Sequence, residues 1–515
     1  MKRYKIFTLI LLVAGMSTFS SCGKLEPEDY SEINPSIFPK TEEDLQSLVM
    51  SCYYPLRGSW WDGIFSTSER GIQAVNDATC GIISGTSGIQ KIMSQMNYYP
   101  NTERLTWFYY TSSSKYGGHG YANKISRCTL VLDQIEKSSL SDELKNKYEA
   151  EVRCARAFMS YVLYDMFGTL VVAPIETLNN PLEEKSLPRL TTAEMVKFID
   201  DDLDFAVKYL PSPSATEYGR FSKGLANMLK IRLYLHETPN DKSYFNKVET
   251  IAREMMKSDY GYELQSDYNA MFDRGGQGSA NKELIWAIPC SYNGPCYNQW
   301  HLMVLPTNFS DHGMGAGWGS FCSTWYFYNS FEEKDIRKER LLTSYKASDG
   351  NTYTKEKPGS SKLKIGPIPL KFGYDTGVST SGGYTDIDIV IFRYADVYLS
   401  LAEALVEKTG ATAADFQEAI GYINKIRERA GLEDLTYANY NTADKLLDAI
   451  LMERYHEFWC ENGQYRADLI RYHRLAPLVQ TITQSPYAAQ YKELYPLPLQ
   501  VISDGKGAVI QNPGY

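Results

Sequence analysis

The chain has 515 residues, 43% of them hydrophobic and 22% charged, which is the composition of a folded globular protein with a sizeable core. Its formal net charge is −9 and no strong basic run follows the N-terminus. The chain as a whole therefore lacks the positive charge that a nucleic-acid-binding protein needs to neutralise phosphates. The 40 tyrosines are unusual, because tyrosine joins an apolar ring to a polar hydroxyl and suits both wet binding faces and helix surfaces.

The first 21 residues are typical of a secretory signal peptide. Basic residues come first, and the apolar run 6–16 that follows is too short to span a bilayer. Small residues then precede Cys22, and residues 19–22 resemble a bacterial lipobox with phenylalanine in place of the usual leucine. We therefore expect Cys22 to become the lipidated first residue of the mature protein, which acyl chains alone would hold at a membrane.

The other eight cysteines show no metal-binding or redox pattern. No two of them are spaced as Cys-x-x-Cys, so neither a zinc site nor a thioredoxin-like motif is supported. Cys128 and Cys154 fall on apolar faces of predicted helices and are expected in the core. In an exported protein some of the eight could form disulfides, and which of them pair is left open.

Helical periodicity dominates residues 122–262. Thr191 and Glu194 have the spacing of a capping box at the start of a helix, and Gly168 is a stop signal for the helix before it. The short connections between these helices predict helical hairpins. Apolar side chains recur every three or four positions in the segments 125–135, 152–166, 222–236 and 244–256.

The periodic pattern resumes near the C-terminus, in residues 386–515. Apolar stripes run through 394–405, 416–426 and 447–458, and Gly431 ends the second of them. We therefore predict a mainly α fold of tetratricopeptide-like stacked helical hairpins. In such a fold the apolar stripes form the core and carry no ligand role.

Two regions lack this periodicity and are rich in Gly, Ser, Asn and aromatic residues. Long irregular stretches inside a compact protein usually carry function. The predicted organisation is therefore a signal peptide (1–21), a lipidated N-terminus with a loop-rich segment (22–121), a helical scaffold (122–262), a loop-rich ligand-binding insertion (263–385) and a C-terminal helical segment (386–515).

The motifs of common catalytic sites are missing from the sequence. None of the six histidines forms His-Glu-x-x-His, and neither a Gly-x-Ser-x-Gly elbow nor a Gly-x-x-x-x-Gly-Lys phosphate loop occurs. The glycine-rich run 313–319 has no βαβ context, so a dinucleotide site is not expected. We predict no catalytic activity and no cofactor, and no residues are assigned to a metal; whether a structural metal is bound is left open. The enzymatic alternative is a lipid-anchored glycoside hydrolase, because two carboxylates distant in sequence can meet in space.

Aromatic residues of the two irregular regions are the remaining binding candidates. A flat indole or phenol ring stacks on the apolar C–H face of a sugar, while nearby polar groups bond the sugar hydroxyls. Trp318 is the strongest candidate, because the glycines on both sides keep the backbone low and leave the ring exposed. The alternative is that such rings fill a small satellite core beneath long loops. The full set of predicted glycan-binding residues is Trp60, Trp61, Tyr292, Tyr297, Trp300, Trp318 and Trp325.

Several motifs occur in an order that is specific as a set. After the lipobox they are YEAEVRCARAFMSYVLYDMFGTLVV (148–172), RFSKGLANMLKIRLYLH (220–236), FRYADVYLSLAEAL (392–405), INKIRERAGL (423–432), ERYHEFWCENGQYRADLIRY (453–472) and the closing QNPGY. On these motifs the chain resembles the SusD/RagB family of Bacteroidetes surface lipoproteins. One departure is an extra residue between Glu461 and Arg466, in a motif that is structural in the family.

The resemblance implies a tetratricopeptide-like helical scaffold with a variable, loop-rich half that binds ligand. It also implies glycan capture on the outer surface of the outer membrane, beside a SusC-like TonB-dependent transporter that receives the ligand. Residues 317–331 resemble the segment that carries an exposed binding tryptophan in the starch-binding member. The match places that role on Trp318 and, through a looser match upstream, on Trp300. Some relatives take peptides, so a peptide ligand is the alternative within this class.

Overall fold

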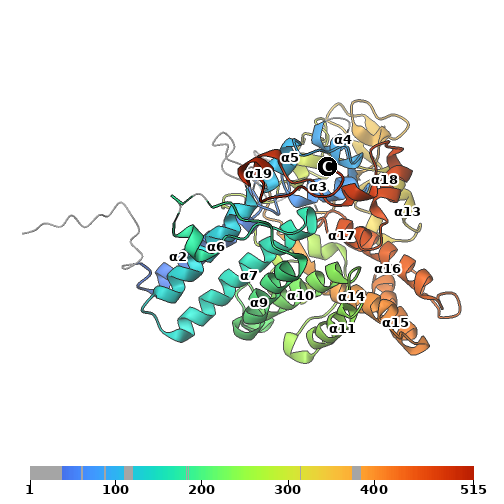
Figure 1. The fold of residues 1–515 in the computed structure, drawn as a ribbon. Helices are drawn as coiled ribbons and strands as arrows, with labels where there is room; N and C mark the ends of the chain where they lie inside the picture. The colour runs from blue at the N-terminus through green and yellow to red at the C-terminus, as the bar shows by residue number, and fades with distance from the viewer. Residues whose placement is uncertain are drawn as a thin grey trace, which may run out of the picture.

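A computed structural model describes residues 38–59, 62–85, 88–109, 120–180, 182–183, 185–313, 315–373 and 384–515. Within these ranges helices carry the architecture and the strands are short, which confirms the predicted mainly α class. Figure 1 shows the long helices side by side along one edge of the molecule, with the shorter elements gathered above them.

The first set of helices packs in chain order. Helix α6 packs on α7, α7 on α9, α9 on α10 and α10 on α11, while α2 lies against both α6 and α7. Consecutive pairing of this kind is the stacked-hairpin arrangement that the apolar stripes predict. The members of this set are α2 (Glu42–Tyr53), α6 (Tyr121–Lys137), α7 (Asp142–Phe167), the short α8 (Ile175–Leu178), α9 (Thr192–Tyr209), α10 (Lys223–Glu237) and α11 (Tyr244–Met255).

The ends of these helices follow signals that are visible in the sequence. The side chain of Thr191 accepts a hydrogen bond from the backbone N–H of Glu194. In return, the Glu194 carboxylate accepts the backbone N–H of Thr191 at 2.8 Å. Helix α7 ends at Gly168, whose φ of +77° is a conformation that favours glycine. The capping box and the stop signal are therefore confirmed.

The C-terminal helices continue the same stack. Helix α14 packs on α11, and α14, α15 and α16 pack on one another. Because it lies between these neighbours, α14 is buried from Tyr394 to Val406. The members of this set are α14 (Tyr394–Glu407), α15 (Ala413–Arg429) and α16 (Ala443–Glu457). They are followed by α17 (Tyr465–Ile470), which packs on both α16 and α3, and by α18 (Leu475–Thr483) and α19 (Leu499–Asp504).

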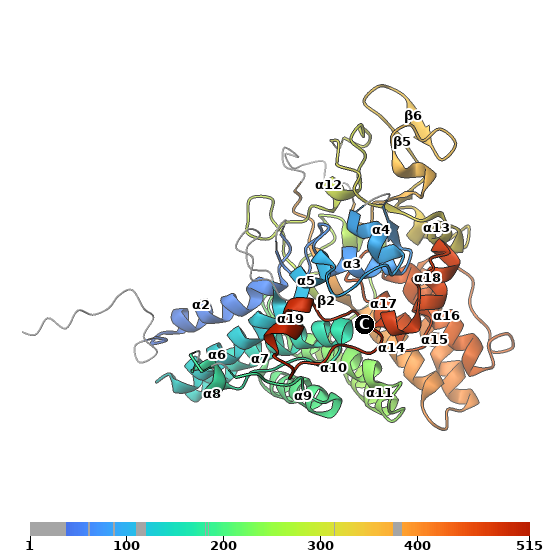
Figure 2. The same ribbon diagram turned by 45° about the horizontal axis from the view of Figure 1, so that its top comes forward.

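The loop-rich half is built from short elements. The segment before residue 121 was expected to be loop-rich, yet in addition to α2 it contains α3 (Ile72–Thr79), α4 (Gly88–Ser94) and α5 (Glu103–Tyr109). Figure 2 shows the hairpin of β5 and β6 at the outer end of this half, away from α9 and α11. The remaining elements are α12 (Trp300–Val304), α13 (Trp325–Ser330) and the strands β1 (Ile83–Ser84), β2 (Leu284–Ile288), β3 (Cys322–Ser323), β4 (Leu341–Leu342), β5 (Ser344–Lys346), β6 (Thr352–Thr354), β7 (Ile368–Pro369) and β8 (Ile389–Arg393).

Two strand pairs connect this half to the scaffold and to itself. Strands β2 and β8 are antiparallel, with Leu284 opposite Arg393 and Ile288 opposite Ile389, and α10 packs on β2. The segment between the two strands therefore leaves the scaffold and returns to it at one place. Strand β1 pairs with β3, and the Ser323 hydroxyl donates to the carbonyl of residue 82 at 2.6 Å. The two irregular regions of the sequence thus form one unit.

Charged residues of the C-terminal motifs are buried at this junction. The Arg393 guanidinium contacts Glu283 at 2.7 Å and Glu457 and Glu461 at 2.8 Å, and all four side chains are almost fully buried. Arg466, which follows the extra residue of the last motif, is buried with its guanidinium 3.9 Å from the centre of the Tyr495 ring. These motif residues hold elements together and do not face a ligand.

Candidate functional site

Trp318 stands out because its side chain is exposed while its backbone is firmly held. The relative exposure of the residue is 53%. Its backbone N–H donates to the carbonyl of Leu302 at 2.7 Å, and the N–H groups of Gly317 and Gly319 donate to the carbonyls of Pro306 and Leu305 at 3.1 and 2.8 Å. The loop is therefore bonded to the C-terminal end of α12, and a rigidly mounted ring loses little freedom when a ligand stacks on it.

The two flanking glycines explain how the loop reaches this position. A Cβ atom on Gly317 would collide with the carbonyl oxygens of Leu302 and Leu305, so only glycine allows this close approach. Gly319 has a φ of +56°, which also favours glycine. The exposure of Trp318 that the sequence predicts is confirmed, and its contact with a ligand stays a prediction.

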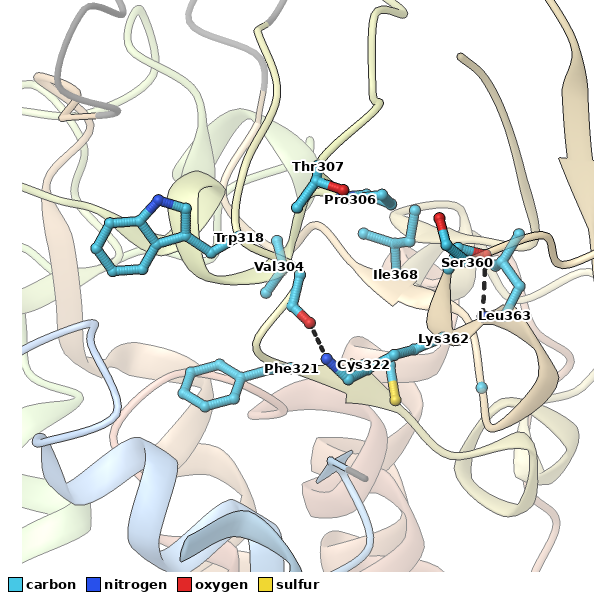
Figure 3. Close-up of a pocket in the computed structure, with 13 residues that line it drawn as sticks. Val304, Pro306, Thr307, Trp318, Phe321, Cys322, Ser360, Lys362, Leu363 and Ile368 are labelled. Carbon is cyan, nitrogen blue, oxygen red and sulfur yellow. Dashed lines mark hydrogen bonds between the residues drawn. The ribbon is translucent and has the colours of Figure 1, made fainter. Parts of the chain in front are cut away.

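A cavity of about 100 Å³ lies beside the Trp318 loop. The Lys362 ammonium, which lines this cavity, donates a hydrogen bond to the carbonyl of Gly319 and so holds the Trp318 loop from the side of the cavity. Figure 3 shows the indole of Trp318 extending away from Ser360, Lys362 and Leu363, so the ring stands at the rim and not inside the cavity. The cavity is lined by Val304, Pro306, Thr307, Trp318, Gly319, Phe321, Cys322, Ser360, Ser361, Lys362, Leu363, Gly366 and Ile368.

A second aromatic group lies at the other end of α12. The rings of Tyr297 and Tyr384 stack with centroids 4.1 Å apart, and Tyr297 is half-buried. Tyr292 is 37% exposed, and its backbone N–H donates to the Asp386 carboxylate at 2.7 Å. Since Tyr297 precedes α12 by three residues and the Trp318 loop is bonded to the same helix, this short helix connects the two aromatic groups.

The carboxylates beside the tyrosines are engaged in structural contacts. Asp386 forms an ion pair with Arg274 at 3.0 Å. Burial raises the pKa of Asp388, against hydrogen bonds from the Tyr218 hydroxyl at 2.7 Å and the backbone N–H of Cys290 at 2.9 Å. Both carboxylates therefore fix the backbone of the 290–297 loop, on which Tyr292 and Tyr297 are mounted.

Trp300 corrects one of the sequence-based expectations. Its relative exposure is 0%, and its indole N–H donates to the carbonyl of Pro369 at 2.6 Å. The rings of Phe321 and Phe372 pack around it at 5.6 and 6.4 Å. A ring enclosed in this way presents no face to a sugar, so the assignment of Trp300 to the binding face is wrong, and the satellite-core alternative holds for this residue.

The other candidates fall between these extremes or outside the described residues. Trp325 is half-buried, its indole N–H donates to the carbonyl of Leu363 at 2.9 Å, and the Lys355 ammonium lies 4.5 Å from its ring centre. Its role in binding stays a prediction. Trp60, Trp61 and Cys22 lie outside the described residues.

Two further tyrosines of this half bear on the site: Tyr384, which the sequence did not single out, and Tyr326, which belongs to the cluster of candidate aromatic residues in the second irregular region. Tyr384 supplies the second ring of the stacked pair, and Tyr326 is 44% exposed directly after Trp325. No local pattern marks Tyr384, since its partner is distant in sequence. Tyr326 lies within the segment 317–331 and clusters in sequence with Trp318 and Trp325, which is the pattern that marks it as a candidate.

The fold and the exposed rings together define a class: a stacked-helix scaffold that presents an aromatic, loop-rich face. A family model described as "SusD family" matches residues 360–515, and a second, described as "Starch-binding associating with outer membrane", matches residues 61–235. Over these two stretches the chain matches the SusD/RagB family.

Individual relatives resemble the chain over most of its length. SusD-like protein P2 of Formosa agariphila is 25% identical, over 87% of this chain and 85% of that protein. The starch-binding protein SusD of Bacteroides thetaiotaomicron is 23% identical, over 82% of this chain and 81% of that protein. Surface glycan-binding protein A from Bacteroides thetaiotaomicron, solved in complex with laminarihexaose, superimposes with a TM-score of 0.70 at 20% identity, over 91% of this chain and 99% of that chain.

Proposed function

We propose that the protein is a cell-surface lipoprotein that captures a glycan and passes it to a SusC-like TonB-dependent transporter, without chemistry of its own. The observation that carries the proposal is the exposed indole of Trp318 on a loop fixed to α12. A ring mounted in this way offers a flat apolar face next to water, which suits the C–H face of a pyranose. The stacked pair of Tyr297 and Tyr384 adds aromatic surface near the other end of the helix.

The relatives support a glycan as the ligand. One aligned relative is named as a starch-binding protein, and one structural neighbour was solved with laminarihexaose bound. These two ligands differ in linkage, so they favour the chemical class and not one sugar. A peptide is the second candidate ligand, because the same aromatic surface would also bind apolar side chains.

The described residues contain a Ser–His–Asp grouping, but its geometry does not suit catalysis. The Ser330 hydroxyl lies 2.9 Å from Nε2 of His456 and also donates to the carbonyl of Phe327 at 2.6 Å. Nδ1 of His456 is 3.9 Å from the Asp335 carboxylate, which is too long for the orienting hydrogen bond of a triad. Burial holds the pKa of His456 well below its usual value. The grouping supports a structural role and not a hydrolase.

The anchoring and partner proposals rest on the N-terminus and the family. Cys22 would carry the lipid that holds the protein at the outer membrane. None of the helices in the described ranges is long and apolar enough to cross a membrane. The helical stack would offer the large surface that a stable complex with the transporter requires.

Replacing Trp318 by Ala tests the binding proposal. The glycan used is whichever polysaccharide retards the wild-type protein in an affinity gel. If the ring stacks on a sugar, affinity falls by about tenfold to a hundredfold, since aromatic stacking on flat ligands is worth roughly 1–3 kcal/mol. Tyr487→Ala is the matched control, because Tyr487 is an exposed aromatic residue outside the loop-rich insertion.

The outcomes separate the competing functions. Equal affinity of Trp318→Ala and wild type rejects Trp318 as the platform. Retention of peptides and not of any polysaccharide supports the second ligand class. Appearance of new reducing ends after long incubation with the glycan supports the hydrolase.

Two further measurements address the anchor and the transporter. We expect Cys22→Ser to leave the outer-membrane fraction, and a variant that stays there as the wild type does would contradict lipidation. We expect a TonB-dependent transporter to co-purify with the wild type from gently solubilised membranes. Recovery of the protein alone would argue against the complex.

A further inference from the structure

Four lysines lie close together beside the loop that carries the exposed indole. Lys355 and Lys357 follow strand β6, which packs on the one-turn helix η7 (Lys362–Lys364). Three of the four side chains are exposed and that of Lys362 is half-buried. The segment 353–366 holds these four lysines and one acidic residue, in a chain where acidic residues outnumber basic ones by 62 to 53. We call the four residues the lysine cluster.

Hydrogen bonds and a ring contact connect the lysine cluster to two of the candidate tryptophans. The Lys362 ammonium donates to the carbonyl of the residue that follows Trp318. The indole N–H of Trp325 donates to the carbonyl of Leu363 at 2.9 Å, and the Lys355 ammonium lies 4.5 Å from the centre of the Trp325 ring. The cluster is therefore bonded to the Trp318 loop on one side, and Trp325 holds its two halves together.

The positive charge of the lysine cluster is not neutralised by neighbouring carboxylates. Among the residues that the structure describes, none forms an ion pair with any of the four ammonium groups. In the helical scaffold, by contrast, Lys197 and Lys408 contact carboxylates at 2.6 and 2.7 Å. Glu356, the acidic residue of the segment, accepts a hydrogen bond from the Thr354 hydroxyl at 3.0 Å. The cluster thus keeps a net positive charge next to an exposed aromatic ring.

We propose that the glycan captured by this protein is acidic, and that the lysine cluster binds its carboxylate or sulfate groups while Trp318 stacks on a sugar of the same chain. The proposal rests on the proposed function and narrows its ligand class. A lysine ammonium is a compact point charge without a preferred plane, so it binds carboxylate and sulfate alike.

The arrangement also favours a long ligand over a single sugar. Figure 3 shows the indole of Trp318 extending away from Lys362, so a chain of several sugars is needed to contact both side chains. Each exposed ion pair is weak and is screened by salt. Selectivity for an acidic glycan therefore depends on several charges repeated along the ligand, which a polysaccharide supplies.

The first test compares polysaccharides that share a backbone and differ in charge. The full chain, purified from the membrane, is titrated by calorimetry with dextran sulfate and dextran, and with polygalacturonate and its methyl ester. We expect an acidic member to bind about tenfold more tightly than its neutral partner. The pair that shows the difference tells whether sulfate or carboxylate is bound. Equal binding within both pairs overturns the proposal.

Salt provides a second readout of the same titrations. Raising the salt concentration from about 0.01 M to about 0.15 M shortens the Debye length from about 30 Å to about 8 Å. We expect the advantage of the acidic polysaccharide to shrink over this range, while the affinity for a neutral one stays the same. An advantage that does not depend on salt contradicts recognition by exposed lysines.

Variants assign the selectivity to the lysine cluster. Replacing its three exposed lysines by glutamine leaves Lys362 in place to hold the Trp318 loop. We expect affinity for the acidic polysaccharide to fall about tenfold, and an unchanged affinity overturns the proposal. Lys208→Gln is the matched control, because Lys208 is an exposed lysine on α9 whose ammonium lies 4.7 Å from the centre of the Tyr209 ring. The three substitutions, combined in one variant, are Lys355→Gln, Lys357→Gln and Lys364→Gln.

Two other occupants of the lysine cluster give different results. If it binds any polyanion, inorganic polyphosphate, which has no sugar rings, binds as tightly as the acidic polysaccharide, and Trp318→Ala changes neither affinity. If it contacts an acidic face of the transporter, the triple variant keeps its glycan affinity and no longer co-purifies with the transporter. Either result overturns the proposal.

Failure of this proposal is distinguishable from failure of glycan capture. If the wild type binds a neutral polysaccharide through Trp318 and the triple variant binds it and the acidic ones as the wild type does, capture stands and the acidic ligand is wrong. If the wild type binds no polysaccharide, acidic or neutral, capture itself is wrong.

Discussion

The helical scaffold and the loop-rich half are held together by different kinds of contact. In the scaffold the backbone groups pair within helices, so the direction of a side chain follows from its place in the helix. In the loop-rich half they pair across long sequence distances: the N–H of Tyr297 donates to Gly58, and that of Gln299 to the Thr67 hydroxyl. The structure of the scaffold can therefore be predicted from the pattern of neighbouring residues, whereas the position of each aromatic ring in the loops depends on residues that are distant in sequence.

The largest effect should come from breaking the charge cluster where the two regions join. Arg393→Ala removes the cation that Glu283, Glu457 and Glu461 share, and leaves these buried carboxylates with Arg429, Arg337 and Lys371 as their remaining partners. We expect a loss of about 3–5 kcal/mol in the free energy of unfolding, measured by urea denaturation, as for other buried pairs that lose one partner. Arg253→Ala is the control, because Arg253 pairs with Glu418 at the surface. Its expected loss is about 0.2–1 kcal/mol, and equal losses in the two variants would contradict a special role for the junction.

The second effect separates two tryptophans of the same half. Trp300→Ala removes a fully buried ring and should lower the free energy of unfolding by about 3–5 kcal/mol. Trp318→Ala removes an exposed ring and should change it by no more than about 0.5 kcal/mol. Urea denaturation of both variants checks the contrast, and a large loss for Trp318→Ala would mean that its ring packs as core.

The smallest effect should come from the glycine beneath the binding ring. In Gly317→Ala the new methyl group meets the carbonyl oxygens of Leu302 and Leu305, so the loop must move and carry Trp318 with it. We expect glycan affinity to fall by up to about tenfold, which is about 1.4 kcal/mol. In the control Gly275→Ala the methyl group meets nothing within 4 Å. Unchanged affinity in Gly317→Ala would show that the loop adapts without losing its ligand contact.

The scaffold could be predicted from the sequence because its signals are local. Thr191, Glu194 and Gly168 mark helix ends through bonds that each makes with near neighbours. Cys128 and Cys154, expected in the core from helix phase, are fully buried. The helices α2, α3 and α4 were missed. The eight and seven residues of α3 and α4 are too few to establish a period of 3.6, but the twelve residues of α2 are long enough, so its length does not explain the miss.

The candidate site was predictable only where the backbone conformation is encoded locally. Trp318 lies between two glycines, and those glycines permit the close approach that leaves its ring exposed. Trp300 has no such neighbours, and its burial depends on Phe321, Phe372 and Pro369, which come together only in the folded chain. The partnership of Tyr297 with Tyr384 is long-range in the same sense.

The pairing of β2 with β8 makes the loop-rich insertion between them a segment that can be replaced without changing the scaffold. Since Ile288 and Ile389 lie opposite each other, the chain between them leaves the scaffold and returns to it at the same strand pair. The entropy lost on closing a loop grows only slowly with the length of the loop. This insertion can therefore be lengthened, shortened or replaced by that of a relative with little change in the free energy of unfolding. Proteins with this arrangement can acquire new ligand specificities as antibodies do, through changes in the loops while the supporting framework stays constant.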